Sequence, residues 1–113
     1  MAVGLEKLDS LDPAFAAKAR HVVNEMEKLG WNIRIVWGVR TYEENKVLAD
    51  ANFASKNSKH LTGRALDLID QRVAYAFTPG HKYAQDLGRV AKSVGLIWGG
   101  DFMKWDPCHI ELP

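Results

Sequence analysis

Apolar side chains recur at spacings of three and four along residues 13–29, which is the pattern of one helix face. Asp12-Pro13 is typical of a helix start, because aspartate can cap free backbone amides and proline suits the first helical position. Gly30 is typical of a helix end. We therefore predict an amphipathic helix whose apolar positions are Phe15, Ala19, Val22, Met26 and Leu29.

Two more helices are predicted downstream. Thr41 and Glu44 have the spacing of a capping box, which indicates a short helix that runs through about Ala51. A further helix follows a turn at Thr78-Pro79-Gly80 and ends at Gly95. It is indicated by four apolar residues at helical spacing: Tyr83, Leu87, Val90 and Val94.

Segments rich in β-branched, aromatic and other apolar residues predict about four short strands. They are Asn32–Trp37, Ala65–Ile69, Leu96–Trp98 and His109–Leu112, and a polar loop is expected over residues 53–59. Three helices and about four strands place the chain in the α+β class, with the helices packed against a small antiparallel sheet.

Length and composition narrow the class of protein. The 113 residues, 47% of them hydrophobic, predict one globular domain over residues 1–113. The 15 basic and 14 acidic residues nearly balance and no run of five like charges occurs, so nucleic acid is not an expected partner. A single cysteine excludes an internal disulfide and a Cys-rich structural metal site.

The N-terminal residues 1–13 lack the basic start and the apolar stretch of a signal peptide. No run approaches the ~20 apolar residues of a membrane span. We therefore expect a monomer that is made in the cytoplasm and does not insert into a membrane. Any action outside the cell would then need a separate route of release.

The segment 58–68, SKHLTGRALDL, carries the first candidates for metal chemistry. A loop that turns at Gly63 and runs into a strand could bring His60 and Asp67 to one point. Asp67 stands among apolar residues, where a carboxylate must be paired or must bind a metal. We favour metal binding for this pair over a structural capping or ion-pairing role.

His109 is the candidate third ligand. His21 falls on the polar side of the first helix and His81 follows a Pro-Gly turn, so we expect both to be exposed. Asp106 lies three residues before His109 and could take a proton from a water at the metal, although a plain turn residue is the alternative. Three ligands and a spare carboxylate predict an open catalytic Zn²⁺ site rather than a closed structural one.

The chain resembles the zinc peptidases that cut bacterial cell-wall peptides in one two-part pattern: Ser58-x-His60-x-x-Gly63-x-Ala65-x-Asp67, then Asp106-x-x-His109. The family comprises D-alanyl-D-alanine carboxypeptidases and phage L-alanyl-D-glutamate endopeptidases, and it shares a fold with lysostaphin-type enzymes and the hedgehog domain. Residues 38–41 (GVRT) and 98–102 (WGGDF) match as well, so the resemblance spans about residues 33–112.

The resemblance implies roles for the polar residues of this pattern. Zn²⁺ would be bound by His60, Asp67 and His109, and Asp106 would be the catalytic base. The α+β fold would thus be built around one zinc site. The expected partner is a peptidoglycan peptide substrate.

Arg40 and Ser58 are the further site residues that the resemblance implies. Arg40 would bind the substrate carboxylate or polarise the scissile carbonyl, with a surface ion pair as the alternative, and Ser58 would add a hydrogen bond. Asn45 departs from the glutamine that relatives often carry. We expect Glu111 to be an ion-pairing or supporting residue rather than a ligand, and Trp37 to lie in the core.

We therefore predict a zinc metallopeptidase acting on peptidoglycan stem peptides. The leading form is a phage-type endolysin that cuts the L-alanyl-D-glutamate bond and reaches the wall through a membrane pore. A D-alanyl-D-alanine carboxypeptidase, which would normally need export, is the alternative. A zinc-stabilised binding module without activity is the alternative from another class, although Asp106 and Arg40 would be dispensable in it.

Overall fold

The computed structural model describes residues 2–52, 54, 58–74 and 80–113. Within them the chain forms an α+β fold with one four-stranded sheet, as the sequence predicts. The elements follow in this order: η1 (Leu5–Ser10), α1 (Pro13–Lys28), β1 (Ile33–Trp37), α2 (Tyr42–Asp50), η2 (Lys59–Thr62), β2 (Ala65–Asp70), α3 (Lys82–Ser93), β3 (Ile97–Trp98), η3 (Gly99–Asp101) and β4 (His109–Glu111), where η denotes a 3₁₀ helix.

The sheet has the strand order β1-β2-β4-β3, and all three neighbouring pairs are antiparallel. The last strand, β4, therefore lies between β2 and β3. In this register Asp67 of β2 lies opposite His109 of β4, and Trp37 of β1 lies opposite Asp67 on the other side. Residues 37, 67 and 109 thus form a row across the sheet.

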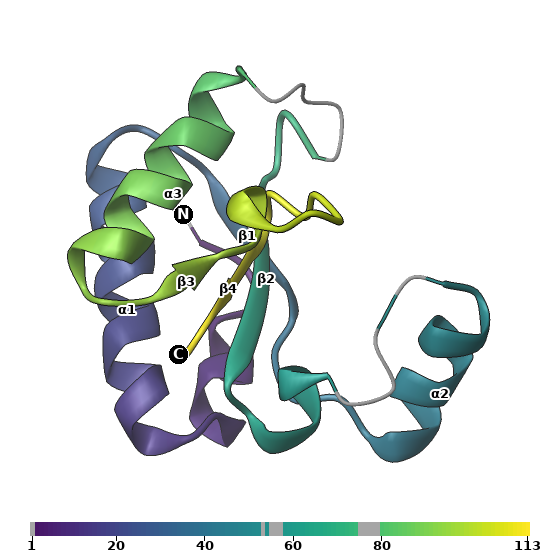
Figure 1. Cartoon of the computed structure of the whole chain (residues 1–113). Helices are drawn as coiled ribbons and strands as arrows, with labels where there is room; N and C mark the ends of the chain where they lie inside the picture. The colour runs from purple at the N-terminus through teal and green to yellow at the C-terminus, as the bar shows by residue number, and fades with distance from the viewer. Residues whose placement is uncertain (1, 53, 55–57, 75–79) are drawn as a thin grey trace.

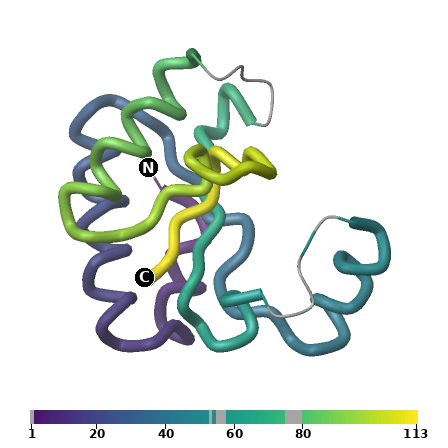
Figure 2. The backbone as a smooth tube through the Cα atoms, in the orientation of Figure 1, coloured from purple at the N-terminus to yellow at the C-terminus, as the bar shows by residue number. Residues whose placement is uncertain are grey.

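Helices α1 and α3 cover one face of the sheet, and α2 stands apart from them in Figures 1 and 2. The apolar faces of α1 and α3 and one face of the strands form the core, because alternate strand residues point to opposite sides. The core includes the largest fully buried side chains, among them Phe15, Met26, Ile33, Leu66, Leu68, Tyr83, Leu87 and Ile110. The opposite face of β2 and β4 is left to carry Asp67 and His109.

The predicted helix signals act as expected. The Asp12 side chain accepts hydrogen bonds from the amides of Ala14 and Phe15 at the start of α1. Thr41 and Glu44 form a reciprocal capping box at the start of α2. These caps satisfy amides that have no partner inside the helix.

Short 3₁₀ helices are the main difference from the sequence prediction. Helix η1 buries only Leu8, and η2 occupies part of the segment expected to be loop. Helices of four and six residues are too short to produce a periodic pattern. Of the turn predicted at residues 78–80, Thr78 and Pro79 lie outside the described residues, as does most of the loop at residues 53–59. Within the described part of the chain, no helix is both long and apolar enough to cross a membrane.

Candidate metal centre

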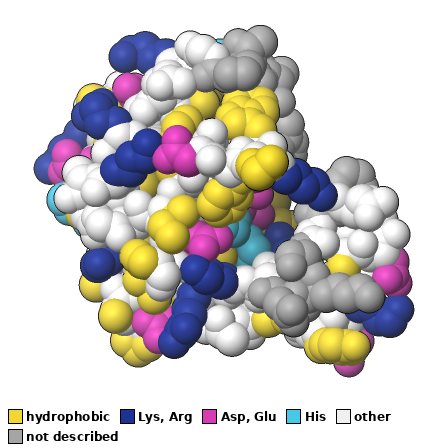
Figure 3. Space-filling model, viewed as in Figure 1, with side chains coloured by type: hydrophobic (Ala, Val, Ile, Leu, Met, Phe, Trp, Pro, Cys, Tyr) yellow, Lys and Arg dark blue, Asp and Glu magenta, His cyan; other side chains and the backbone are white. Residues whose placement is uncertain are grey.

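The uncovered face of the sheet forms the floor of a cavity of about 880 Å³. Its walls come from α2 and the residues after it, from η2, and from the segment between η3 and β4. Figure 3 shows this hollow with histidine side chains at its floor. Residues 60, 67, 106 and 109, which the sequence places in two distant segments, all line it.

The cavity floor carries one group of side chains that could bind a metal ion. His60, Asp67 and His109 each offer a ligand atom, and these atoms lie within 4.8 Å of one another. His60 Nε2 is 3.3 Å from Asp67 Oδ2, and His109 Nδ1 is 3.0 Å from Asp67 Oδ1. Two imidazoles and one carboxylate are a donor set that suits a catalytic zinc ion.

His60 is oriented by its own short helix and by the end of β1. The Ser58 hydroxyl caps η2 and accepts from the amide of His60, while the His60 ring is 2% exposed. Its Nδ1 lies 2.9 Å from the Gly38 carbonyl. A carbonyl oxygen can only accept, so we assign the proton to Nδ1 and a lone pair to Nε2.

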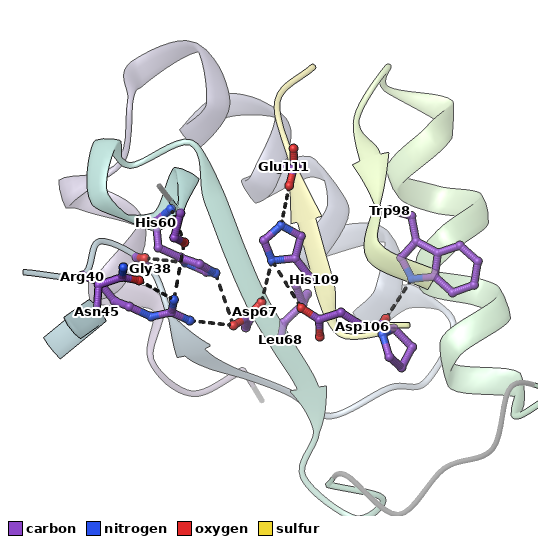
Figure 4. Close-up of polar contacts among 12 residues, drawn as sticks. Gly38, Arg40, Asn45, His60, Asp67, Leu68, Trp98, Asp106, His109 and Glu111 are labelled. Carbon is purple, nitrogen blue, oxygen red and sulfur yellow. Dashed lines mark hydrogen bonds and ion pairs between the residues drawn. The ribbon is translucent and has the colours of Figure 1, made fainter. Parts of the chain in front are cut away.

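The surroundings of His60 Nε2 show whether this site fits a metal ion. Among the described residues it has no hydrogen-bond partner, although it is buried. The Asp67 carboxylate oxygen lies 3.3 Å away without hydrogen-bond geometry, and two acceptors that face each other at this distance are unfavourable. A cation between them would satisfy both atoms. The donor set therefore fits a bound metal ion (Figure 4).

Asp67 is held in its ionised form. Burial alone would raise the pKa of this carboxyl group, but its contacts with His109 and His60 outweigh burial and bring the pKa well below its usual range. Arg40 adds an ion pair at 3.3 Å. Asp67 can therefore offer a negative oxygen ligand throughout the neutral pH range.

His109 is oriented from both edges of its ring. Nδ1 faces Asp67 at 3.0 Å and Asp106 at 3.8 Å, and Nε2 lies 2.7 Å from Glu111 Oε1. Burial lowers the pKa of His109, but hydrogen bonds to Asp67 and Glu111 and the charge of Asp106 raise it overall. Several carboxylates thus surround this imidazole.

Asp106 stands on the cavity wall with its side chain 49% exposed. Its amide donates to the Gly99 carbonyl, and its own carbonyl accepts from the His109 amide, so a short turn fixes it beside the third candidate ligand. Burial and the negative charge of Asp67 raise the pKa of Asp106 above its ordinary value. A raised pKa makes a carboxylate a better proton acceptor.

Arg40 is drawn into the site rather than exposed in a surface ion pair. It is 5% exposed, and its guanidinium contacts Asp67, Asn45 Oδ1 at 3.2 Å and Ser58 Oγ at 3.4 Å. It also lies over the Trp37 ring, 4.9 Å from the centroid. Burial lowers the pKa of Arg40, and the charges of Asp67 and Asp106 oppose that shift.

A protein-family model described as D-alanyl-D-alanine carboxypeptidase matches residues 52–112, more than half of the chain. The chain belongs to this family. The matched segment includes His60, Asp67, Asp106 and His109, whereas Arg40 precedes it. No curated protein matches the chain significantly.

Solved structures of cell-wall peptidases share the fold of this family member. The Serratia marcescens L-Ala D-Glu endopeptidase ChiX superposes with a TM-score of 0.72 at 22% identity, covering 96% of this chain and 84% of its own. The LD-carboxypeptidase LdcB gives 0.67 at 18% identity, with 90% and 58% covered. The vancomycin resistance D,D-pentapeptidase VanY, solved in complex with Zn(II), gives 0.67 at 16% identity, with 90% and 72% covered.

Two sequence predictions about the surroundings of single residues, Trp37 in the cavity and His81 at the start of α3, are wrong. Trp37 was assigned to the core, but it lines the cavity under Arg40, because the bulge at the end of β1 turns its side chain toward that face. His81 was expected to be exposed. It is half-buried, and its Nδ1 accepts from the Tyr83 amide as the N-cap of α3.

Asn45, which the sequence marked only as a departure from the glutamine of relatives, is a supporting residue of the site. It is 2% exposed and accepts from the Arg40 guanidinium, although it lies on α2 among polar residues. Its place five residues after Arg40, where relatives often carry glutamine, was the signal for this position. His21 is exposed, as predicted.

Proposed function

We propose that this chain is a zinc peptidase that hydrolyses peptidoglycan stem peptides. The proposal rests above all on the buried, unpartnered His60 Nε2, which points at an ionised Asp67 beside His109 on the floor of a large cavity. Family membership and the cell-wall peptidases that share the fold support it. The single domain expected over residues 1–113 would be the catalytic domain.

The proposed ligands are His60 Nε2, an oxygen of Asp67 and His109 Nδ1. Three protein ligands leave a coordination position open, which is typical of catalytic rather than structural zinc. Bound Zn²⁺ would supply Lewis acidity, which polarises a carbonyl and lowers the pKa of water.

The chain's own residues would carry the proton and bind the substrate. Asp106, half-exposed on the cavity wall, would accept a proton from the attacking water and return it to the leaving amine. Arg40 would stabilise negative charge on the substrate, either a carboxylate or the developing oxyanion. Ser58 and Asn45 contact the Arg40 guanidinium, so we assign them to its orientation.

The bond that we propose is cleaved is L-alanyl-D-glutamate. The fold similarity to the Serratia endopeptidase, with a TM-score of 0.72 over 96% of the chain, favours this choice. Cleavage of D-alanyl-D-alanine is the second candidate, favoured by the description of the matching family. The phage-type endolysin role, with release through a membrane pore, stays a prediction.

The decisive experiment combines metal analysis with digestion of purified peptidoglycan followed by mass spectrometry. We expect about one zinc per chain and release of stem fragments that begin at D-glutamate. Loss of one terminal D-alanine would instead assign the carboxypeptidase activity. Zinc-loaded protein that binds cell walls at acid, neutral and alkaline pH but leaves them intact would show a binding module and contradict the proposal.

A further inference from the structure

Glu111 is a nearly buried carboxylate at the edge of the candidate metal centre. It follows His109 by two positions on β4, so both side chains lie on the cavity face of the sheet. Its side chain is 14% exposed, and opposite it on β2 stands the small residue Ala65. The strand register thus makes room for a carboxylate against one edge of the His109 ring.

Both oxygens of this carboxylate are occupied. Oε1 lies 2.7 Å from His109 Nε2, and Oε2 lies 2.6 Å from Lys59 Nζ. Lys59 also donates to the Leu112 carbonyl at 2.6 Å and is the residue directly before His60. One lysine therefore connects the helix η2, which carries the first candidate ligand, to the strand β4, which carries the third.

The contact with Glu111 decides which nitrogen of His109 is available. An ionised carboxylate only accepts hydrogen bonds, so Nε2 must keep its proton. On the opposite edge of the ring, Nδ1 faces Asp67 at 3.0 Å and belongs to the group of candidate ligand atoms, so it is the nitrogen whose proton a bound metal ion would replace. Figure 4 shows this order, with Glu111 and Asp67 on opposite sides of the His109 imidazole.

We infer that Glu111 is a positioning residue that, fixed by Lys59, orients His109 with Nδ1 toward the metal. This inference rests on the proposed function, because it takes His109 as a zinc ligand. Glu111 is not part of the ligand group of His60, Asp67 and His109, and its carboxylate lies on the far side of the ring. Hydrogen bonds from ligand histidines to such carboxylates fix the ring and strengthen metal binding.

Zinc affinity of the full chain, measured by competition with a chelator, tests the inference. Glu111→Ala should weaken zinc binding by about 10- to 100-fold. Glu111→Gln should restore part of that loss, since its amide oxygen still accepts from Nε2. Lys59→Met should weaken binding less than Glu111→Ala, because it loosens Glu111 without removing it. Glu25→Gln breaks another Lys–Glu pair, with Lys28 on α1, and should leave affinity unchanged.

The ring state of His109 gives a second readout, by ¹⁵N NMR of the zinc-loaded protein. Wild type and Glu111→Gln should both show the proton on Nε2 and the metal on Nδ1, and a metal on Nε2 would overturn the inference. Unchanged affinity in Glu111→Ala would overturn it as well. Affinity lost in Glu111→Gln as fully as in His109→Ala would make Glu111 a ligand and also refute a positioning role. A wild-type chain that binds no zinc would instead refute the proposed function itself.

Discussion

Asp106 is the residue whose removal should separate metal binding from catalysis. It lies on the cavity wall but contributes no atom to the group of His60, Asp67 and His109. Asp106→Ala should therefore retain zinc while the rate of peptidoglycan hydrolysis falls by about 10²- to 10⁴-fold, the usual contribution of a general base. Metal analysis and wall-digestion assays on the same sample would check both halves.

Asp101→Asn is the matched control for that experiment. Asp101 is a half-exposed carboxylate on the neighbouring η3, paired with Lys92 rather than with any site residue. The Asp101→Asn variant should hydrolyse peptidoglycan at the wild-type rate. Wild-type hydrolysis by Asp106→Ala would contradict the assignment of the base.

A substitution at Arg40 tests the binding of substrate rather than the binding of metal. Arg40→Lys keeps the positive charge, but an ammonium cannot contact Asp67, Asn45 and Ser58 as the planar guanidinium does. We expect kcat/KM to fall by about 10²- to 10³-fold, the usual cost of losing one oxyanion donor. Steady-state kinetics would measure it, with zinc content as the control. A kcat/KM within about 2-fold of wild type would rule out a direct contact with the reacting group.

At the scale of single residues, the sequence predicted the candidate ligands His60, Asp67 and His109 but not the contacts that support them. Asp67 was recognisable because a carboxylate inside an apolar strand needs a partner. The contacts of Asn45 and Trp37 with Arg40 were not predicted, since Asn45 was marked only as a departure from the glutamine of relatives and a tryptophan in a strand is ordinarily a core residue. Their contacts with Arg40 exist only once β1 and α2 are placed together.

At the scale of elements, Asp70 at the end of strand β2 predicts how the stability of the fold changes at acid pH. The fully buried Asp70 accepts from Arg72 and from the backbone amides of Asn32, Arg72 and Val73. Burial alone would raise the pKa of Asp70, but these hydrogen bonds lower it to about 2, from an ordinary value of 3.8. The ionised form thereby ties the end of β2 to the start of β1.

A lowered pKa stabilises the fold above the unfolded-state pKa, and the contribution is lost as the pH falls toward the folded-state pKa. The difference in unfolding free energy between wild type and Asp70→Asn should therefore shrink by about 2 kcal/mol between about pH 6 and pH 2. Urea unfolding of the metal-free proteins would measure it. A difference that does not vary with pH would contradict the prediction.

The contact between α3 and β3 gives a second prediction at this scale. A Cβ on Gly88 would come within 2.5 Å of the Trp98 ring, and Trp98 Nε1 donates to the Pro107 carbonyl at 2.8 Å, next to Asp106. Gly88→Ala should therefore destabilise the fold by about 1 to 3 kcal/mol, although alanine favours helices. Gly88→Ala should also reduce peptidoglycan hydrolysis, because a shifted Trp98 would displace the loop that carries Asp106 and Pro107.

Thermal unfolding would measure this effect, with Gly80→Ala as the control. A Cβ on Gly80 meets no described atom within 4 Å, so that variant should be close to neutral. A Gly88→Ala protein more stable than wild type would mean that Trp98 moves aside at little cost.

At the scale of the whole molecule, the three candidate ligands come from segments that lie far apart in the sequence. Zinc bound at His60, Asp67 and His109 would connect η2, β2 and β4. Zinc at about 100 times its Kd should stabilise the native state by about 2.7 kcal/mol and raise the Tm by about 10 °C. Calorimetry with zinc and with a chelator would measure the shift.

His60→Ala should remove most of that zinc-dependent shift, because it deletes one of the three candidate ligands. His21→Ala, which changes an exposed histidine of α1, should keep it. An equal shift in both variants would place the zinc elsewhere on the chain.

The sequence by itself determined the helices, the strands and the identity of the candidate ligands. These follow from local causes: apolar periodicity, the Asp12 and Thr41 caps, and an aspartate that has no reason to be in an apolar strand. Each cause acts within about one turn of helix or one strand, so it can be read from a short window.

The tertiary structure alone decided how these ligands meet and what supports them. The order β1-β2-β4-β3 brings His109 opposite Asp67, and the same register places Glu111 against the other edge of the His109 ring. Strand order and register depend on which surfaces pack together across the whole chain, and no local pattern contains that information. The candidate ligands can therefore be predicted from the sequence, whereas their arrangement around one point depends on the fold.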